Sequence, residues 1–510
     1  MNWMQYLKLE MQLRLFERVK LKRLVLFGAL ILIAIWQLSF VPGGRHLTNL
    51  YKNGASTGIQ EGTDKFFYFY YHLGLFPVYS SQAVQGDSKE EAREIIEHHG
   101  DTLYMEYHHV VRAGDLGRIW TFLPKALFTG STKNLSVLQT HIALFVFALL
   151  ALFYSFWRQG YGALGLILII FLGSNPFQLY EVYGNENVFS WPISVACLLL
   201  AFHLPLILGS EKKKNFRPYY KWALPIATGL FLATVRQIRA EPAAMILGVT
   251  FVYLTVSGER WRNRFGLTLL LGLFYWSGAH FWQHYFDAKY EKAVQTVQAA
   301  GGDLYTGPRE FNHSHWHPIF CGLGDFDKKY GYDWNDPVGY AYARPFMEAK
   351  LGVKLPDMDG CCATKVFYDA QKHYYMRPYE MPIYDVVLRE KILHDITHDP
   401  LWYAGILWNR FKRNLRELPP PSLTIRQGTL PIPIRAWVFL MFFFALVALK
   451  RWELVKLVVF TVPLGATSML VYSYGGLSFY NIWHLVTAAI MVAVLLEVAL
   501  SYGLILKGRT

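Results

Sequence analysis

Long apolar runs alternate with short basic segments along most of this chain. A helix needs about 20 apolar residues to cross the hydrocarbon of a bilayer, and runs of about that length recur. On hydropathy we predict an all-α polytopic membrane protein with about ten transmembrane helices. The predicted spans lie near residues 23–41, 138–156, 161–179, 189–208, 221–236, 240–256, 265–284, 433–450, 455–473 and 482–505.

The basic residues predict the orientation of these spans, because Lys and Arg collect in cytoplasmic loops. The N-terminal segment is basic and amphipathic, and we expect it on the inner leaflet. The loops at 158–160, 211–221, 259–266 and 450–456 then fall on the same side, as does the C-terminal tail. We therefore expect a multi-pass protein of the plasma or inner membrane with both termini in the cytoplasm.

This topology divides the chain into five parts. Residues 1–42 form an inner basic segment and the first span, and residues 43–136 a first outer loop. Residues 137–284 form a bundle of six spans, residues 285–431 a second outer loop, and residues 432–510 three final spans. Both outer loops are too long for simple connectors, so we expect them to fold as mixed helical and irregular structure.

Composition agrees with a membrane protein. The chain is 53% hydrophobic and only 17% charged, whereas soluble domains carry about 25% charged residues. The net charge of +13 comes from basic residues spread over the inner loops. It therefore indicates contact with anionic lipids, and we expect no nucleic-acid partner.

We expect two segments of the predicted outer loops to form helices that lie along the membrane surface. One covers residues 116–128. The other covers residues 400–418, where apolar and basic residues segregate at helical spacing before three consecutive prolines at 419–421. The second begins with the pattern D-P-x-x-Y at residues 399–403 and leads into a returning span.

The many spans, the long first outer loop with acidic residues, the large late outer loop and this D-P-x-x-Y helix together resemble the GT-C superfamily of membrane glycosyltransferases. The resemblance implies transfer of a sugar from a polyprenyl-phosphate donor at the outer face, in the cell envelope. The acceptor would be a glycan, a lipid or a protein. Two other classes stay open: a transporter, although no inverted repeat is visible, and a non-catalytic accessory subunit.

Sugar transfer needs a carboxylate that takes a proton from the acceptor hydroxyl. The first acidic residues after the first span are Glu61 and Asp64, followed by an aromatic run suited to sugar stacking. We assign them as candidate bases, with solvated turn carboxylates as the alternative. Glu186 lies in a short outer loop, where it would contact a substrate or a metal, or cap a helix.

The leaving lipid phosphate calls for cations, and arginine matches phosphate oxygens well. Arg236 and Arg239 lie at the outer end of a span, so we assign them to the donor phosphate; an Arg239–Glu241 ion pair is the alternative. His484 and Tyr480 are four residues apart at the outer end of the last span. We assign them to the same phosphate, with helix packing as the alternative.

The second outer loop contains His313, His315 and His317, which would share one face of an extended segment. Three readings stay open: a metal site, contact of His315 or His317 with a glycan or phosphate, and a structural loop. A divalent cation is thus the one cofactor that we keep as an option. In the same loop, Cys321 could pair with Cys361 or Cys362.

Overall fold

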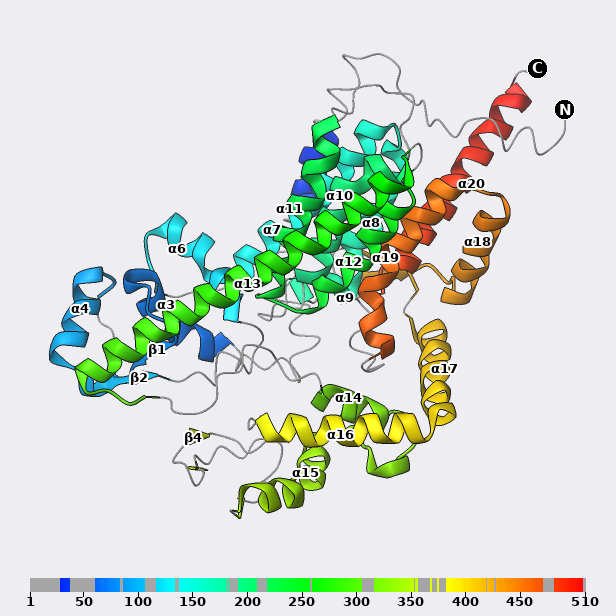
Figure 1. Ribbon diagram of the computed structural model, residues 1–510. Coiled ribbons are helices and arrows are strands. Elements are labelled where there is room, and N and C mark those ends of the chain that lie inside the picture. The colour runs from blue at the N-terminus through cyan, green and yellow to red at the C-terminus, as the bar shows by residue number, and fades with distance from the viewer. Residues whose placement is uncertain are drawn as a thin grey trace.

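The protein is predominantly helical (Figure 1). Its structure, a computed structural model, describes most of the chain and leaves gaps, chiefly in the loops. The described residues are 28–36, 60–82, 86–105, 116–133, 137–179, 181–182, 191–208, 218–256, 259–304, 316–352, 354–355, 367–368, 374–375, 382–418, 420–425, 428–470 and 481–507. Strands occur there only as three small antiparallel pairs. The predicted helical class is therefore confirmed.

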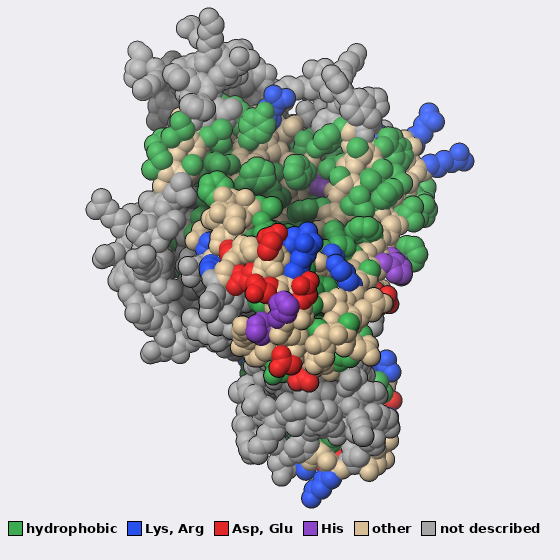
Figure 2. Space-filling model, turned by 90° about the vertical axis from the view of Figure 1, so that its left-hand side faces the viewer, with side chains coloured by type: hydrophobic (Ala, Val, Ile, Leu, Met, Phe, Trp, Pro, Cys, Tyr) green, Lys and Arg blue, Asp and Glu red, His purple; other side chains and the backbone are tan. Residues whose placement is uncertain are grey.

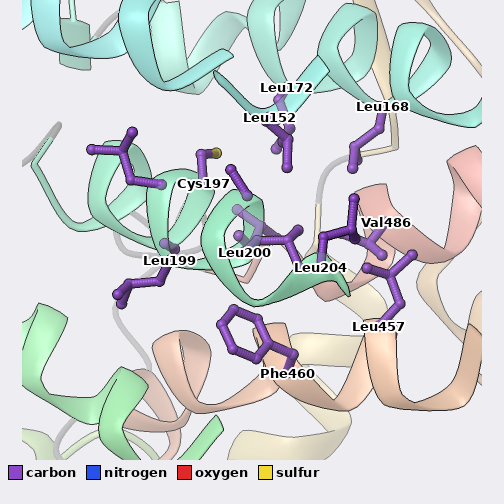
Figure 3. Close-up of a cluster of buried hydrophobic side chains, with 14 of the residues drawn as sticks. Leu152, Leu168, Leu172, Cys197, Leu199, Leu200, Leu204, Leu457, Phe460 and Val486 are labelled. Atoms are coloured by element: carbon purple, nitrogen blue, oxygen red, sulfur yellow. The ribbon is translucent and has the colours of Figure 1, made fainter. Parts of the chain in front are cut away.

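An apolar bundle forms the centre of the molecule. Its helices are α7 (Leu138–Gln159), α8 (Gly162–Ser174), α10 (Trp191–Ile207), α11 (Pro218–Arg236), α12 (Met245–Leu254), α18 (Ala436–Ala448), α19 (Trp452–Leu470), α20 (Trp483–Lys507) and the first half of α13 (Trp261–Ala300). Helix α10 is buried on nearly all sides. Figure 3 shows its Leu199, Leu200 and Leu204 among side chains of α7, α8, α19 and α20.

Helix length gives less support for ten spans than hydropathy does. Among the described helices, only residues Gln139–Gln159 are both long and apolar enough to cross a membrane. Five apolar helices are shorter: Gly162–Ser174, Trp191–Ile207, Glu241–Leu254, Ala436–Ala448 and Trp483–Val498. Helix α8 stops early because Asn175 precedes Pro176 and takes extended backbone angles, as residues before proline usually do.

The outside of the bundle is nevertheless rich in large hydrophobic side chains. Figure 2 shows them gathered in the upper part of one face, with charged side chains below. Examples are Phe147, Leu247, Trp276 and Phe444, each about 60% exposed. Monomeric soluble proteins rarely expose apolar surface on this scale, so this surface calls for lipid or a partner.

A first outer body packs around the far half of α13. It contains α3 (Gln60–Leu73), β1 (Val78–Ser80), α4 (Lys89–His98), η2 (Gly100–Thr102), β2 (Leu103–Met105), η3 (Leu116–Phe122) and α6 (Leu123–Thr129). Strands β1 and β2 pair antiparallel. Phe286, Tyr290, Ala293 and Val297 of α13 are buried in its core. Their spacing of three and four residues explains why α13 runs on to Ala300, beyond the span predicted at 265–284.

A second outer body lies below the bundle in Figure 1. It contains α14 (Trp316–Leu323), η7 (Lys329–Gly331), α15 (Asp336–Leu351), β3 (Phe367–Tyr368), β4 (Tyr374–Tyr375), α16 (Pro382–His398) and α17 (Pro400–Glu417). The predicted helix at 400–418 is thus confirmed. After it, the hairpin of β5 (Ser422–Ile425) and β6 (Gly428–Pro431) leads back to α18.

Candidate functional site

The first outer body meets the bundle where η3 touches the outer end of α11. The amide of Gly117 donates a hydrogen bond of 2.8 Å to the carbonyl oxygen of Gln237. A Cβ at Gly117 would lie 2.6 Å from Gln237 Cβ and 2.7 Å from the Trp120 ring, so only glycine allows this approach. The contact brings Arg118 into the neighbourhood of Arg239.

Arg118 is the most buried cation of this junction, at 2% exposure. Burial, and then the neighbouring charge of Arg239, lower the pKa of Arg118 to about 10. It therefore stays charged at neutral pH. Two guanidinium groups held near each other at low exposure repel, and an anion placed between them would relieve that repulsion.

The two arginines assigned from the sequence differ in their contacts. Arg239 forms an ion pair with Glu241, which begins the short helix η6 (Glu241–Ala244). The salt-bridge alternative for Arg239 is thus present. Arg236 donates to the hydroxyl of Tyr275 on α13 at 3.4 Å. Both arginines therefore belong to the junction between α11, η6 and α13.

Buried polar side chains continue from this junction across the same end of the bundle. They are His141, Asn175, Gln178, Glu181, Asn481 and His484, and we call them the outer polar layer. The hydroxyl of Thr140, beside His141, donates to the Thr121 carbonyl of η3 at 3.0 Å. Helices α8 and α20 pack together, and both carry members of this layer or lie next to them in the chain.

His484 lies in the first turn of α20 and is 3% exposed. Its Nδ1 contacts the carbonyl oxygen of Asn481, and its ring packs near Phe439 and Trp483. The packing alternative for His484 is therefore real, and its neighbour Asn481 extends the polar layer toward α19. Tyr480 lies outside the described residues.

Glu61 and Asp64 lie in the first two turns of α3. Helix α3 packs against η3, the element that carries Arg118. The aromatic run that follows Asp64 is not an open platform for a sugar, because Phe66, Phe67 and Phe69 are at most 1% exposed. That interpretation was wrong because these rings form the core of the first outer body.

Two further assigned residues, Glu186 and His315, lie outside the described residues, as do His313, Cys361 and Cys362. His317 is described and lies in the first turn of α14, so the extended segment predicted for the three histidines does not continue to it. Its Nδ1 lies 2.7 Å from the Tyr384 hydroxyl, and its Nε2 lies 3.8 Å from Cys321 Sγ. His317 thus joins α14 to α16.

No cluster of three or more His, Cys, Asp or Glu residues suited to a metal occurs within the described ranges. The acidic residue Asp325 instead faces Arg410, whose Nε lies 3.3 Å away. Arg410 is fully buried and also donates to the carbonyl oxygens of Gly322 and Met469, at 2.5 and 3.1 Å. This arginine fastens the second outer body to α19.

The sequence reasoning missed Arg118, Glu181 and Gln178. Arg118 lies within the segment at 116–128, which was interpreted only as an amphipathic helix. The preceding Gly117 was the one local sign that another segment packs closely there. Glu181 and Gln178 follow the Asn-Pro step that ends α8, and a helix end leaves backbone groups that need polar partners.

No protein-family model, curated protein or solved structure matches this chain.

Proposed function

We propose that this chain is a multi-pass membrane glycosyltransferase that takes a sugar from a polyprenyl-phosphate donor. The observation that carries this proposal is the pairing of a buried Arg118 with a partly buried Arg239 at one end of an apolar-surfaced bundle. A lipid phosphate combines the two properties that such a site selects, a negative head and an apolar tail.

The bare hydrophobic exterior supports the membrane part of the proposal. Helices α8 and α10 have 13 and 17 residues, which makes them about 20 and 25 Å long. A hydrocarbon core is about 30 Å thick. Short helices are accommodated by local thinning of the bilayer and by their polar ends, and the long helices α7, α13 and α20 are not limited in this way.

The proposed reaction assigns each group a step. The acceptor hydroxyl attacks the anomeric carbon, and the bond from that carbon to the phosphate oxygen breaks. Arg118 and Arg239 stabilise the charge on the departing phosphate, and His484 assists from α20. Asp64 takes the hydroxyl proton, with Glu61 or Glu186 as the next candidate. The packing of α3 on η3 supports an arrangement with base and phosphate site on neighbouring elements.

Two substitutions test these roles in reconstituted membranes. We expect Asp64→Asn to lower turnover about a hundredfold or more while the donor still binds, because a general base acts on the chemical step. We expect Arg239→Ala to weaken donor binding about tenfold or more, since a charged hydrogen bond contributes about 1.5–3 kcal/mol. Sugar transfer and donor binding are measured separately, with the exposed Asp101→Asn as control.

Normal turnover in Asp64→Asn would move the base to Glu61 or Glu186. If neither Asp64→Asn nor Arg239→Ala changes transfer or binding, the glycosyltransferase proposal fails.

A further inference from the structure

A second group of polar side chains lies where α9 (Pro176–Leu179) packs against strand β5. The hydroxyl of Ser174, at the end of α8, donates to the carbonyl oxygen of Ile170 at 2.5 Å and lies 3.5 Å from the carbonyl oxygen of Ser422. Ser422 and Thr424 alternate with Leu423 along the strand, so they share one face, and both are buried. Strand β5 packs against both α8 and α9, so these two buried side chains belong to an element of that junction.

Gln178, on α9, is the unusual member of this junction. It is 1% exposed, and neither atom of its side-chain amide has a hydrogen-bond partner in the part of the chain that the structure describes. The Thr424 hydroxyl, on a residue 3% exposed, is likewise without a partner there. Buried polar groups are nearly always satisfied, because an unsatisfied one costs about 1–3 kcal/mol.

A hydrogen-bond partner for the Gln178 amide and the Thr424 hydroxyl must suit two uncharged groups. An amide offers two N–H donors and one carbonyl acceptor, and a hydroxyl offers both functions. A phosphodiester or an ionised carboxylate has no proton to donate to the Gln178 carbonyl oxygen, whereas a sugar hydroxyl both donates and accepts. The junction of Arg118 and Arg239 has a different preference, since both guanidinium groups are donors and the carboxylate of Glu241 is already paired with Arg239. The same end of the bundle thus holds two chemically distinct places.

We propose that Gln178 and Thr424 form a subsite for the neutral hydroxyl groups of the transferred sugar, separate from the arginine junction that holds the phosphate. The inference rests on the proposed function and deepens it: it assigns the donor an orientation, with its uncharged ring at α9 and β5 and its phosphate at η3 and η6. It also states the substrate class, an uncharged sugar.

The test uses purified protein in nanodiscs with three lipid probes. They are a polyprenyl phosphate without sugar, the same lipid carrying a neutral hexose, and a neutral hexosyl diacylglycerol. We expect wild-type protein to bind the hexose-bearing phosphate at least about tenfold more tightly than the bare phosphate, because the sugar adds two or more neutral hydrogen bonds.

Gln178→Leu should abolish that tenfold preference and leave binding of the bare phosphate unchanged. Thr424→Val should act in the same direction with a smaller effect. Arg239→Ala should weaken both phosphate probes and spare the hexosyl diacylglycerol. The matched control is Gln139→Leu, the same chemical change at an exposed position of α7 at the same end of the bundle.

The outcomes separate the two proposals. If Gln178→Leu binds the hexose-bearing lipid as wild type does and unfolds at a higher temperature, the amide holds an ordered water only and the subsite is refuted. If wild type binds the hexosyl diacylglycerol through Gln178 but neither phosphate, the subsite stands and the phosphate-donor function falls. If no probe binds, both fail.

Discussion

Asp87 illustrates how single side chains hold the first outer body together. Its carboxylate accepts hydrogen bonds from the amide and the hydroxyl of Thr132, at 2.7 and 2.5 Å, and lies 3.0 Å from His72 Nε2. Burial raises the pKa of this carboxyl, but hydrogen bonds from Ser131, Thr132 and His72 outweigh it and hold the pKa well below its usual range. The charged form is therefore the stabilising one.

We accordingly expect Asp87→Asn to lower the free energy of unfolding by about 1.5–3 kcal/mol at pH 7, the range for hydrogen bonds to a charged group. A depressed folded pKa contributes stability that is complete above the unfolded value of about 3.9 and is lost as the pH falls further. The difference between variant and wild type should thus shrink below about pH 4. Thermal unfolding in detergent measures it.

Asp101→Asn, at an exposed position, serves as the control for Asp87→Asn. If the difference in unfolding free energy between Asp87→Asn and wild type is as large at pH 3 as at pH 7, the charge of Asp87 does not stabilise the loop at 131–133.

At the scale of elements, the approach of η3 to α11 depends on Gly117. An added methyl group would meet Gln237 and Trp120 at 2.6–2.7 Å. Overpacking of this kind costs about 1–3 kcal/mol. We expect Gly117→Ala to push η3 outward, and so to weaken both stability and donor binding by separating Arg118 from Arg239.

The control for Gly117→Ala is Gly272→Ala on α13, because a Cβ there meets nothing within 4 Å. That change should be neutral or slightly stabilising, since alanine favours a helix over glycine. If Gly117→Ala binds the donor as tightly as wild type does, phosphate binding does not depend on the position of η3.

The sequence predicted these elements unevenly, for physical reasons. Helix α17 could be predicted because Asp399 caps it, Pro400 starts it and the prolines after Leu418 end it. The C-terminal end of α13 could not be predicted, because its last turns are stabilised by packing against the core of the first outer body, which the local sequence does not reveal. Strand β2 has no clear local signal, because it depends on the pairing of Leu103 with Ser80 of β1.

The candidate site was less predictable than the elements. Arg236 and Arg239 were assigned from the sequence because charges at the end of a predicted span are costly and therefore conspicuous. The surroundings of Arg118 and Gln178 arise only from tertiary contacts: Gly117, beside Arg118, bonds to Gln237, and α9, which carries Gln178, packs against β5. Neither contact joins residues close in sequence, so no local pattern announces it.

At the scale of the whole molecule, the apolar exterior and the two outer bodies imply a definite orientation. In Figure 1 both bodies lie away from the end where α20 finishes. Most of the basic segment at 259–266, predicted as a loop, forms the start of α13, and α13 runs from that end toward the first outer body. If the bundle spans the membrane, residues near Gln82 and residues near Arg262 must face opposite compartments.

This orientation predicts a labelling pattern in intact cells. We expect Gln82→Cys to react with a membrane-impermeant maleimide directly, and Arg262→Cys to react only after permeabilisation. Both positions are exposed, so the membrane alone should separate them. Cys361 and Cys362 are first replaced by serine, since both fall in the second outer loop; Cys197 and Cys321 are buried. Labelling of Gln82→Cys only from the inside would invert the topology and place the arginine junction in the cytoplasm. Equal labelling of both positions in intact cells would mean that α13 does not cross the bilayer, and the apolar surface would then need a protein partner.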